Sequence, residues 1–420
     1  MIRRPPRSTQ GVSSAASDVY KRQGIYDQLG GGLSRYSTDY KWLVPHFEKM
    51  LYDNALFVWA LIETFQITKN PVYETAVRDV LSYIEKIMTS SNGAFFSAED
   101  ADSEGVEGKF YLWSKAEVME ILGIESGELA CTYWDITENG NFEGSSIPNR
   151  PRSDQDVAKD FRITVEELQD QLRIARKKLM AVRTKRIRPL LDNKVLTSWN
   201  ALMISAFARA ARVFGDSSFE KTAERAAAFI FKNLKDESGR LLRRWCDGEA
   251  RYPAYLCDYA QMTMACLDLY ETTYDPVWFR KGCELSNEIK RLFRNENGPF
   301  YDTGTDGEVL LTRNAEGYDG VEPSGNSSVA NAFLRLNSYG LESEFFEDAQ
   351  RIFRCFSPMF NQAGVSFCSM LSGLHFSLSG PKEVVISGRR GDAETEALLL
   401  EVRREFHPNT VTAFLEDGNS

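Results

Sequence analysis

The feature that most constrains the fold is a three-part pattern that recurs along the chain. A nearly all-apolar segment at helical spacing is followed by a more amphipathic one. A short G-x-[FL]-[FLY] turn then follows at Gly93, Gly239 and Gly298. A helix that is apolar nearly all round is buried, whereas an amphipathic helix covers a core with one face. Repetition of such pairs predicts an all-α fold, an (α/α)6 toroid of helical hairpins with the apolar helices inside.

The periodicity also sets the expected limits of each element. The apolar helices are predicted at 45–67, 197–214, 256–274 and 327–339. The amphipathic helices are predicted at 72–88, 217–234, 276–293 and 342–356, with Pro358 ending the last one. A further amphipathic helix is expected at 161–188. Short strands are expected at 95–96 and 109–113, around an acidic loop, and a strand–helix–strand segment at 383–388, 394–406 and 410–415.

Composition excludes several classes of function. The 420 residues carry a formal charge of −10, which argues against nucleic-acid partners. No apolar run approaches the roughly 20 residues that span a bilayer, so we expect no membrane partner. The seven cysteines show no CxxC spacing, which disfavours a zinc site or disulfide framework and fits a cytoplasmic protein. The acidic run from Asp100 resembles a calcium loop, but its twelfth position is Tyr111 rather than glutamate, so no metal or cofactor is expected. Composition leaves the oligomeric state open.

Residues 1–23 differ from the rest of the sequence. They hold five basic residues, one acid and no leucine. RRPPRST followed by SSAASDVYKRQ resembles a translated sequencing-library adapter, so we expect 1–23 to be non-native and disordered. The toroid is then expected to occupy residues 24–420.

The richest concentration of chemical groups lies at residues 30–57, GGGLSRYSTDYKWLVPHFEKMLYDNALF. It combines three glycines with aromatic, basic and acidic side chains, and it leads into an apolar helix. Such a loop is a plausible wall of a ligand pocket. The alternative is that its aromatic residues only pack the connection and that His46 only makes structural hydrogen bonds.

Six ordered motifs identify a family resemblance. They are GGGLSRYSTDYKWLVPHFEKMLYDNAL, SAEDADSEGVEGKFYLW, GNFEG, DNKVLTSWNALMI, YLCDYA and PSGNSSVA. Together they resemble the thioredoxin-domain-containing protein family that includes spermatogenesis-associated protein 20. The resemblance implies a six-hairpin, glycosidase-like toroid similar to N-acylglucosamine 2-epimerase. It also implies that this sequence is a fragment, without the family's thioredoxin-like domain and with an incomplete toroid.

In a toroid of this kind, the connections that enter the inner helices are expected to line one funnel. Those connections are 35–53, 192–200, 252–259 and 318–326. Aromatic faces and carboxylates suit a sugar-like small molecule, and we expect such a ligand here. The residues expected to bind it are Arg35, Tyr36, Trp42, His46, Glu48, Trp199, Asn200, Tyr259, Glu322 and Asn326.

A glycosidase needs two carboxyl groups. The candidates are Asp39, Glu48, Asp53, Asp192, Asp258, Asp319 and Glu322. We assign Asp53 and Asp258 as the catalytic pair, with helix capping as the alternative role of each aspartate. A two-histidine epimerase mechanism has less support, because His46 is the one histidine that lies in an entry connection.

Two functions remain open from the sequence. The first is a carbohydrate-active or carbohydrate-binding toroid, with sugar isomerase, epimerase or glycosidase chemistry possible. The second is a non-catalytic scaffold or binding module that partners a thioredoxin-like redox domain. Fold alone does not decide between them.

Overall fold

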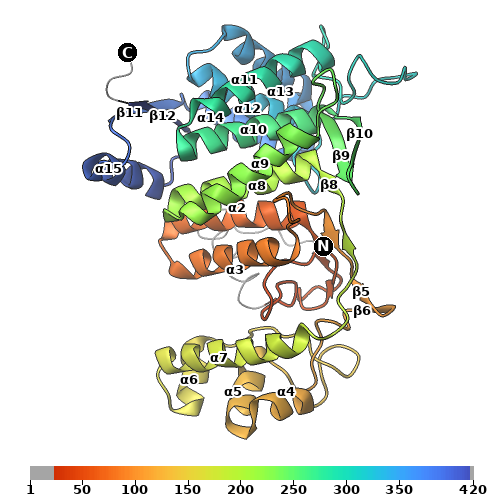
Figure 1. Ribbon diagram of the computed structural model, residues 1–420, viewed down its shortest axis with the longest axis vertical. Helices are drawn as coiled ribbons and strands as arrows, with labels where there is room; N and C mark the ends of the chain where they lie inside the picture. Colours follow the sequence, from red (N-terminus) through yellow and green to blue (C-terminus); the bar gives the residue numbers. More distant parts are fainter. Residues whose placement is uncertain (1–22, 417–420) are drawn as a thin grey trace. The chain divides into compact units, whose positions relative to one another are not determined.

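The computed structural model describes residues 23–416, and these are mostly helical (Figure 1). They form two compact units, each described by itself. The first unit holds the described residues up to Met88 together with Ala98–Asp192. The second holds Thr89–Ser97 and the chain from Asn193 onward. Apart from Gln23, the segment expected to be non-native lies outside the described residues. The extent of the toroidal domain, 24–420, stays a prediction.

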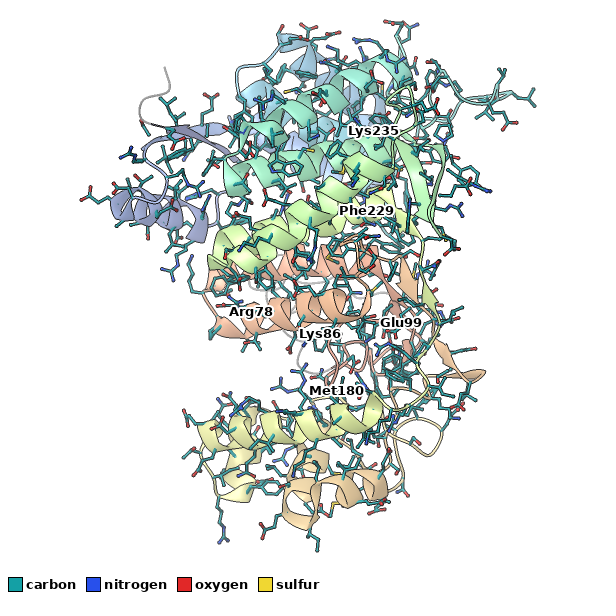
Figure 2. All side chains as sticks on the ribbon, viewed as in Figure 1. Arg78, Lys86, Glu99, Met180, Phe229 and Lys235 are labelled. Atoms are coloured by element: carbon teal, nitrogen blue, oxygen red, sulfur yellow. The ribbon has the colours of Figure 1, made fainter. Side chains whose placement is uncertain are left out.

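The first unit combines helices with very short strands. Its helices are α2 (Leu51–Thr68), α3 (Pro71–Ile87), α4 (Lys115–Leu122), α5 (Ile124–Trp134), α6 (Asp154–Phe161) and α7 (Val165–Arg183). Its strands are β1 (Tyr36–Ser37), β2 (Pro45–His46), β3 (Lys49–Met50), β4 (Ala98–Glu99), β5 (Asp102–Ser103), β6 (Val106–Glu107) and β7 (Leu191–Asp192). β4 lies between β3 and β7 in an antiparallel sheet. Arg78 and Lys86 mark the polar face of α3, whose other face is buried (Figure 2).

The second unit contains three of the predicted hairpins in succession. Its helices are α8 (Thr197–Phe214), α9 (Ser217–Asn233), α10 (Leu256–Thr273), α11 (Pro276–Phe293), α12 (Gly325–Ser338), α13 (Ser343–Ala363), a 3-10 turn (Gly364–Phe367), α14 (Cys368–Leu378) and α15 (Ala393–Arg404). Its strands are β8 (Val195–Leu196), β9 (Leu242–Cys246), β10 (Glu249–Pro253), β11 (Lys382–Gly388) and β12 (Thr410–Glu416).

The pairing of a buried helix with a half-buried one is confirmed. Nearly every residue of α8 and α10 is buried, whereas α9 and α11 bury one face. Asp216 and Asp275 cap α9 and α11 by accepting hydrogen bonds from Ser218 and Val277 backbone N–H groups. α10 packs against both α8 and α12. The close approach of α12 to α10 depends on Gly325, where a Cβ would lie 3.0 Å from the Leu256 side chain.

The predicted strand–helix–strand segment is also confirmed. β11 and β12 pair in parallel, and α15 connects them. Ile386 and Leu399 form a small buried cluster with Tyr274 at the end of α10. None of the described helices has the length and apolar character needed to span a membrane.

Four predicted boundaries are wrong. The amphipathic helix expected at 161–188 is α7, which begins only at Val165, after the cap Thr164, and ends at Arg183, while Phe161 ends the separate helix α6. Pro45 does not begin a helix: Pro45–His46 pairs with β1, and the helix begins at Leu51. The strands near the acidic loop lie within it, at β5 and β6, rather than at 95–96 and 109–113. Pro358 lies inside α13, where the Arg354 carbonyl, which a proline cannot satisfy, accepts a hydrogen bond from Ser357 Oγ. Helix α14 has no counterpart among the predicted elements.

A buried charge network joins α8, α10 and α12 toward their C-terminal ends. Asp268 on α10 binds Arg209 of α8 and Arg335 of α12, each at 3.0 Å. Glu271, one turn further along α10, binds Arg335 at 3.1 Å and also pairs with Arg212. Burial alone would raise the pKa of Asp268, but the surrounding arginines outweigh burial and lower the pKa to about 2.

This network predicts how stability changes in acid. A carboxylate with a lowered pKa contributes stability above its unfolded pKa and loses that contribution as the pH falls through its folded pKa. Between pH 4 and pH 2 the wild type should therefore lose roughly 2 kcal/mol of stability as Asp268 is protonated. Asp268→Asn should lack this part of the pH dependence. Urea unfolding of wild type and variant at pH 5, 4, 3 and 2 measures it. A difference between the two proteins that stays constant across this range would contradict the assignment.

Candidate functional site

Four polar side chains hold the turns of the repeat in place. The Asn200 amide accepts from Phe95 N–H and donates to Phe95 C=O, at 2.8 and 2.9 Å. Asn326 makes the same two bonds to Phe300, and Asn54 makes them to Leu33. On α10 the corresponding residue is Tyr259, whose hydroxyl accepts from Leu241 N–H at 3.0 Å. Phe95, Leu241 and Phe300 are the third residues of the three G-x-[FL]-[FLY] turns.

This arrangement changes the interpretation of three predicted binding residues. Asn200 and Asn326 are fully buried, Tyr259 is 1 % exposed, and their polar atoms bond the backbone. We therefore assign all three to the fold and leave them out of the site proposed below. Each one fixes the turn of its repeat against the first turn of a buried helix.

Asp258 has a comparable position at the start of α10. Its carboxylate accepts from Tyr255 N–H at 2.9 Å, from Ser198 N–H at 3.0 Å and from Arg243 Nη1 at 3.0 Å. The Ser198 bond ties the first turn of α8 to that of α10. Burial raises the pKa of Asp258, and Arg243 and the two backbone donors oppose that shift. The carboxylate is fully buried and has three donors, as the capping alternative requires.

Glu322 differs from Asp258 in one respect. Its Oε1 accepts a hydrogen bond from Trp199 Nε1 at 3.2 Å, while its Oε2 is buried and has no hydrogen-bond partner among the described residues. Burial raises the pKa of Glu322, and the negative charge of Asp258 raises it further. The hydrogen bond from Trp199 and the positive charge of Arg243 lower the pKa. Burial therefore makes this carboxyl group easier to protonate than an exposed glutamate.

Arg243 and its neighbours complete a cluster at the N-terminal ends of these helices. The Arg243 guanidinium stacks over the Tyr255 ring at 4.7 Å and contacts Cys257 Sγ at 3.7 Å. Tyr255 is 43 % exposed and Arg243 is 29 % exposed, so both reach solvent. Burial raises the pKa of the Cys257 thiol, so it is not a ready nucleophile. We call Trp199, Arg243, Tyr255, Cys257, Asp258 and Glu322 the entry cluster.

The predicted residues at 30–57 lie in the first unit. Arg35 pairs with Glu48 at 3.2 Å, and His46 Nδ1 lies 2.8 Å from Glu107 Oε1. Tyr36 stacks on His46 with ring centroids 5.1 Å apart. His46 Nε2 also lies 3.7 Å from Glu48 Oε2, so these partly exposed side chains form one connected group.

Other predicted residues at 30–57 lie nearby. Trp42 is 48 % exposed and has a left-handed backbone, φ 61°. Asp39 accepts from three backbone N–H groups, those of Lys41, Leu43 and Val44, and so holds its own loop.

Asp53 lies in the first turn of α2, in the first unit, whereas Asp258 belongs to the second. Their pairing as catalytic acid and base stays a prediction. Two further carboxyl candidates have structural positions. Asp319 accepts from Ser324, Ser369 and Met370 N–H groups, and Asp192 ends β7.

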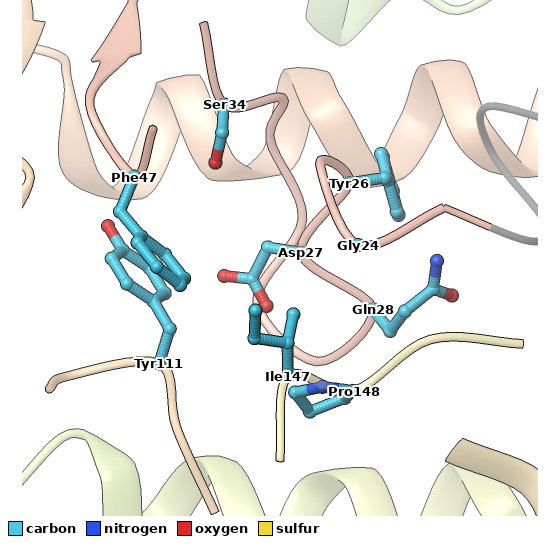
Figure 3. Close-up of a pocket in the computed structure, with 9 residues that line it drawn as sticks. All are labelled: Gly24, Tyr26, Asp27, Gln28, Ser34, Phe47, Tyr111, Ile147 and Pro148. Carbon is cyan, nitrogen blue, oxygen red and sulfur yellow. The ribbon is translucent and has the colours of Figure 1, made fainter. Parts of the chain in front are cut away.

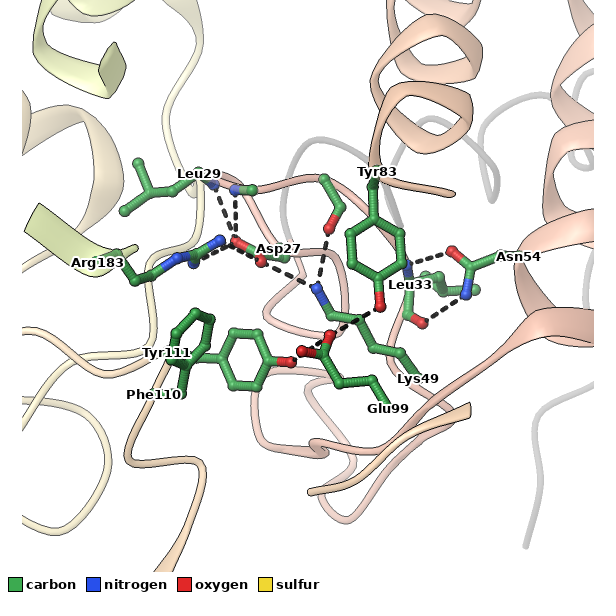
Figure 4. Close-up of polar contacts among 12 residues, drawn as sticks. Asp27, Leu29, Leu33, Lys49, Asn54, Tyr83, Glu99, Phe110, Tyr111 and Arg183 are labelled. Atoms are coloured by element: carbon green, nitrogen blue, oxygen red, sulfur yellow. Dashed lines mark hydrogen bonds and ion pairs between the residues drawn. The ribbon is translucent and has the colours of Figure 1, made fainter. Parts of the chain in front are cut away.

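Sequence reasoning missed a buried polar network in the first unit (Figure 4). Asp27 binds Arg183 through both carboxylate oxygens, at 2.9 and 2.8 Å, and binds Lys49 Nζ at 2.9 Å. Glu99 accepts from the hydroxyls of Tyr83 and Tyr111 at 2.8 and 3.2 Å. Burial would raise the pKa of Asp27, but Arg183 and Lys49 hold it well below its usual range. Placement of Asp27 beside the GGG run was the one sequence signal for it.

A small pocket adjoins this network (Figure 3). Aromatic and aliphatic side chains form most of its wall, and Asp27 is the charged residue in its lining. The residues around it are Gly24, Tyr26, Asp27, Gln28, Ser34, Phe47, Tyr111, Ile147 and Pro148. Both Asp27 oxygens already bind cations, so the pocket offers a ligand little free charge.

The remaining two histidines are not members of the entry cluster. His375 is on α14, within hydrogen-bond reach of Ser379, and His407 lies between α15 and β12; both are exposed. Across residues 23–416, no group of three or more His, Cys, Asp or Glu side chains is arranged to hold a metal ion.

The fold defines the class of this protein. It is an α/α toroid of helical hairpins, and its structure resembles cellobiose 2-epimerase from Spirochaeta thermophila with a TM-score of 0.51. That likeness covers 84 % of this chain and 71 % of the epimerase, at 13 % sequence identity, so it shows the fold alone. No protein-family model matches the chain.

Sequence relatives are more specific. The chain is 32 % identical to spermatogenesis-associated protein 20 from Homo sapiens over 94 % of its length, and the match covers 55 % of that protein. An uncharacterized protein of Caenorhabditis elegans is 33 % identical over 91 % of the chain. The chain is therefore a relative of spermatogenesis-associated protein 20, as its motifs predicted. It spans about half the length of the curated relatives it matches.

Proposed function

We propose that this chain is a carbohydrate-binding toroid and that the entry cluster of the second unit contacts the sugar. Three kinds of group that suit sugars come together there. Trp199 and Tyr255 offer aromatic faces, Arg243 offers N–H donors that reach solvent, and Glu322 offers a carboxyl group. The toroid fold, shared with a cellobiose epimerase, is consistent with such a ligand.

The observation that carries the proposal is the state of Glu322. Buried polar atoms in folded proteins are nearly always hydrogen-bonded, and an exception needs an explanation. Glu322 Oε2 is one of several such atoms among the described residues, and it is the one that belongs to the entry cluster, which reaches solvent through Tyr255 and Arg243. A ligand oxygen at this place would satisfy it.

The second candidate function is a non-catalytic scaffold that partners a thioredoxin-like domain. It is favoured by the carboxylates that already have partners. Asp258 binds Arg243 and two backbone N–H groups, and Glu48 binds Arg35. Sugar isomerase, epimerase or glycosidase chemistry would need a second proton-transfer group besides Glu322. A structure with a bound ligand would identify that group.

A thermal-shift panel tests the proposal. Glucose, mannose, N-acetylglucosamine and cellobiose are added to wild type, to Tyr255→Ala and to Tyr40→Ala, an exposed tyrosine of the first unit. We expect at least one sugar to raise the melting temperature of wild type and Tyr40→Ala. Loss of one aromatic contact should weaken binding to Tyr255→Ala roughly tenfold, about 1.4 kcal/mol. If no sugar shifts a well-folded wild type, the carbohydrate proposal fails and the scaffold is favoured.

A further inference from the structure

The two oxygens of Glu322 are in different environments. Oε1 accepts the indole N–H of Trp199, and Oε2 is buried with no partner among the described residues. An ionised carboxylate offers acceptors only, whereas a carboxylic acid carries one O–H donor. In the carboxylic acid, Oε2 can therefore carry the O–H group while Oε1 accepts from Trp199.

The charged and titratable neighbours leave an ionised Glu322 without a counter-ion. Arg243 on β9 is bonded to Asp258 on α10, and Cys257 on α10 is a neutral thiol. Trp199 on α8 contributes one neutral donor. Burial, together with the Asp258 charge, raises the pKa of Glu322. Because the cation that faces it is already paired, the neutral acid is easier to form here than at an exposed glutamate.

We propose that Glu322 binds the sugar as a carboxylic acid and donates its Oε2 proton to an oxygen of the ligand, with Trp199 as the positioning residue. This inference rests on the proposed function. A proton donor at Glu322 would select ligands that place a hydrogen-bond-accepting oxygen beside Oε2. It also links binding to a proton: because the ligand stabilises the protonated form, affinity is highest below the pKa of Glu322 and falls as the pH rises through it.

Calorimetric titration between pH 5 and pH 8 tests the linkage, with cellobiose and mannose as the probes. For wild type we expect the Kd to rise by up to about tenfold per pH unit above the pKa of Glu322. Glu322→Gln keeps a neutral donor, so it should bind with the low-pH Kd of wild type at every pH. Glu308→Gln changes an exposed glutamate of the same connection and should follow wild type.

The positioning role of Trp199 has its own readout. Its N–H favours the ionised form of Glu322, so Trp199→Phe should raise the pKa of Glu322 and move the midpoint of the affinity curve to higher pH. A merely structural tryptophan would change the affinity without moving that midpoint, which would overturn its role here.

The outcomes separate the two proposals. Sugar binding by wild type that does not vary with pH would overturn the role of Glu322 and leave the carbohydrate site in place. Loss of binding by a folded Glu322→Gln at every pH would also overturn it, because the carboxylate would then be the form required. Absence of binding in all variants, including wild type at pH 5, would overturn the proposed function itself.

Discussion

Replacement of Asp27 by asparagine is expected to lower the free energy of unfolding of the first unit by about 3–5 kcal/mol. Asp27 is the anion bound to both Lys49 and Arg183, which are 1 % and 2 % exposed. Asparagine keeps the size of the side chain but removes its charge. The two buried cations then repel each other without an anion between them. The cost of removing them from water, which the ion pairs with Asp27 offset, becomes a net loss of stability.

Urea unfolding at pH 7, followed by circular dichroism, measures this loss. Asp170→Asn is the matched control, because Asp170 pairs with Arg173 in a bridge whose side chains are 70 % and 73 % exposed. Such surface pairs contribute about 0–1 kcal/mol. The double variant Asp27→Asn with Lys49→Met should recover part of the loss. A loss below 1 kcal/mol for Asp27→Asn would show that this network does not stabilise the unit.

The second large effect is expected at the turns of the repeat. Asn200→Leu keeps the branched heavy-atom skeleton of the side chain but removes both hydrogen bonds to Phe95. Each buried backbone group left without a partner costs about 1–3 kcal/mol, so we expect about 2–5 kcal/mol of destabilisation. The turn at Gly93 should also exchange its amide protons faster, because Phe95 N–H loses its acceptor.

Denaturant unfolding and hydrogen exchange at Phe95 measure the two effects. Asn297→Leu, at an exposed asparagine in the connection after α11, is the control and should change stability by less than about 0.5 kcal/mol. Tyr259→Phe removes a single bond to Leu241 and should cost about 1 kcal/mol. Equal effects of Asn200→Leu and Asn297→Leu would contradict the role assigned to this side chain.

Periodicity and turn chemistry predicted the helical part of the fold well. α8 and α11 have the expected limits, because the apolar pattern, Gly215 and the Asp275–Pro276 pair are local signals that mark helix ends. Local signals failed where tertiary contacts decide the outcome. Pro45 fits a first helical turn, yet pairing of His46 with Tyr36 makes it part of a strand. The Arg354 carbonyl finds Ser357, so α13 continues past Pro358.

The site was less accessible to sequence reasoning. Asn200, Tyr259 and Asn326 were predicted to bind a ligand, but their partners in the structure are backbone groups in turns 18 to 105 residues away, which no spacing rule reveals. The network around Asp27 joins it to Arg183, 156 positions further along the chain. Glu322 was found as a polar group in an entry connection, while the difference between its two oxygens required coordinates.

A crystal structure of the chain with the sugar that gives the largest thermal shift is the most direct test of the entry cluster as the carbohydrate site. We expect a sugar ring against Trp199 and Tyr255, with a ligand oxygen within about 3.2 Å of Glu322 Oε2. Sugar density elsewhere, with Glu322 Oε2 still lacking a partner, would contradict the assignment of the entry cluster as the carbohydrate site.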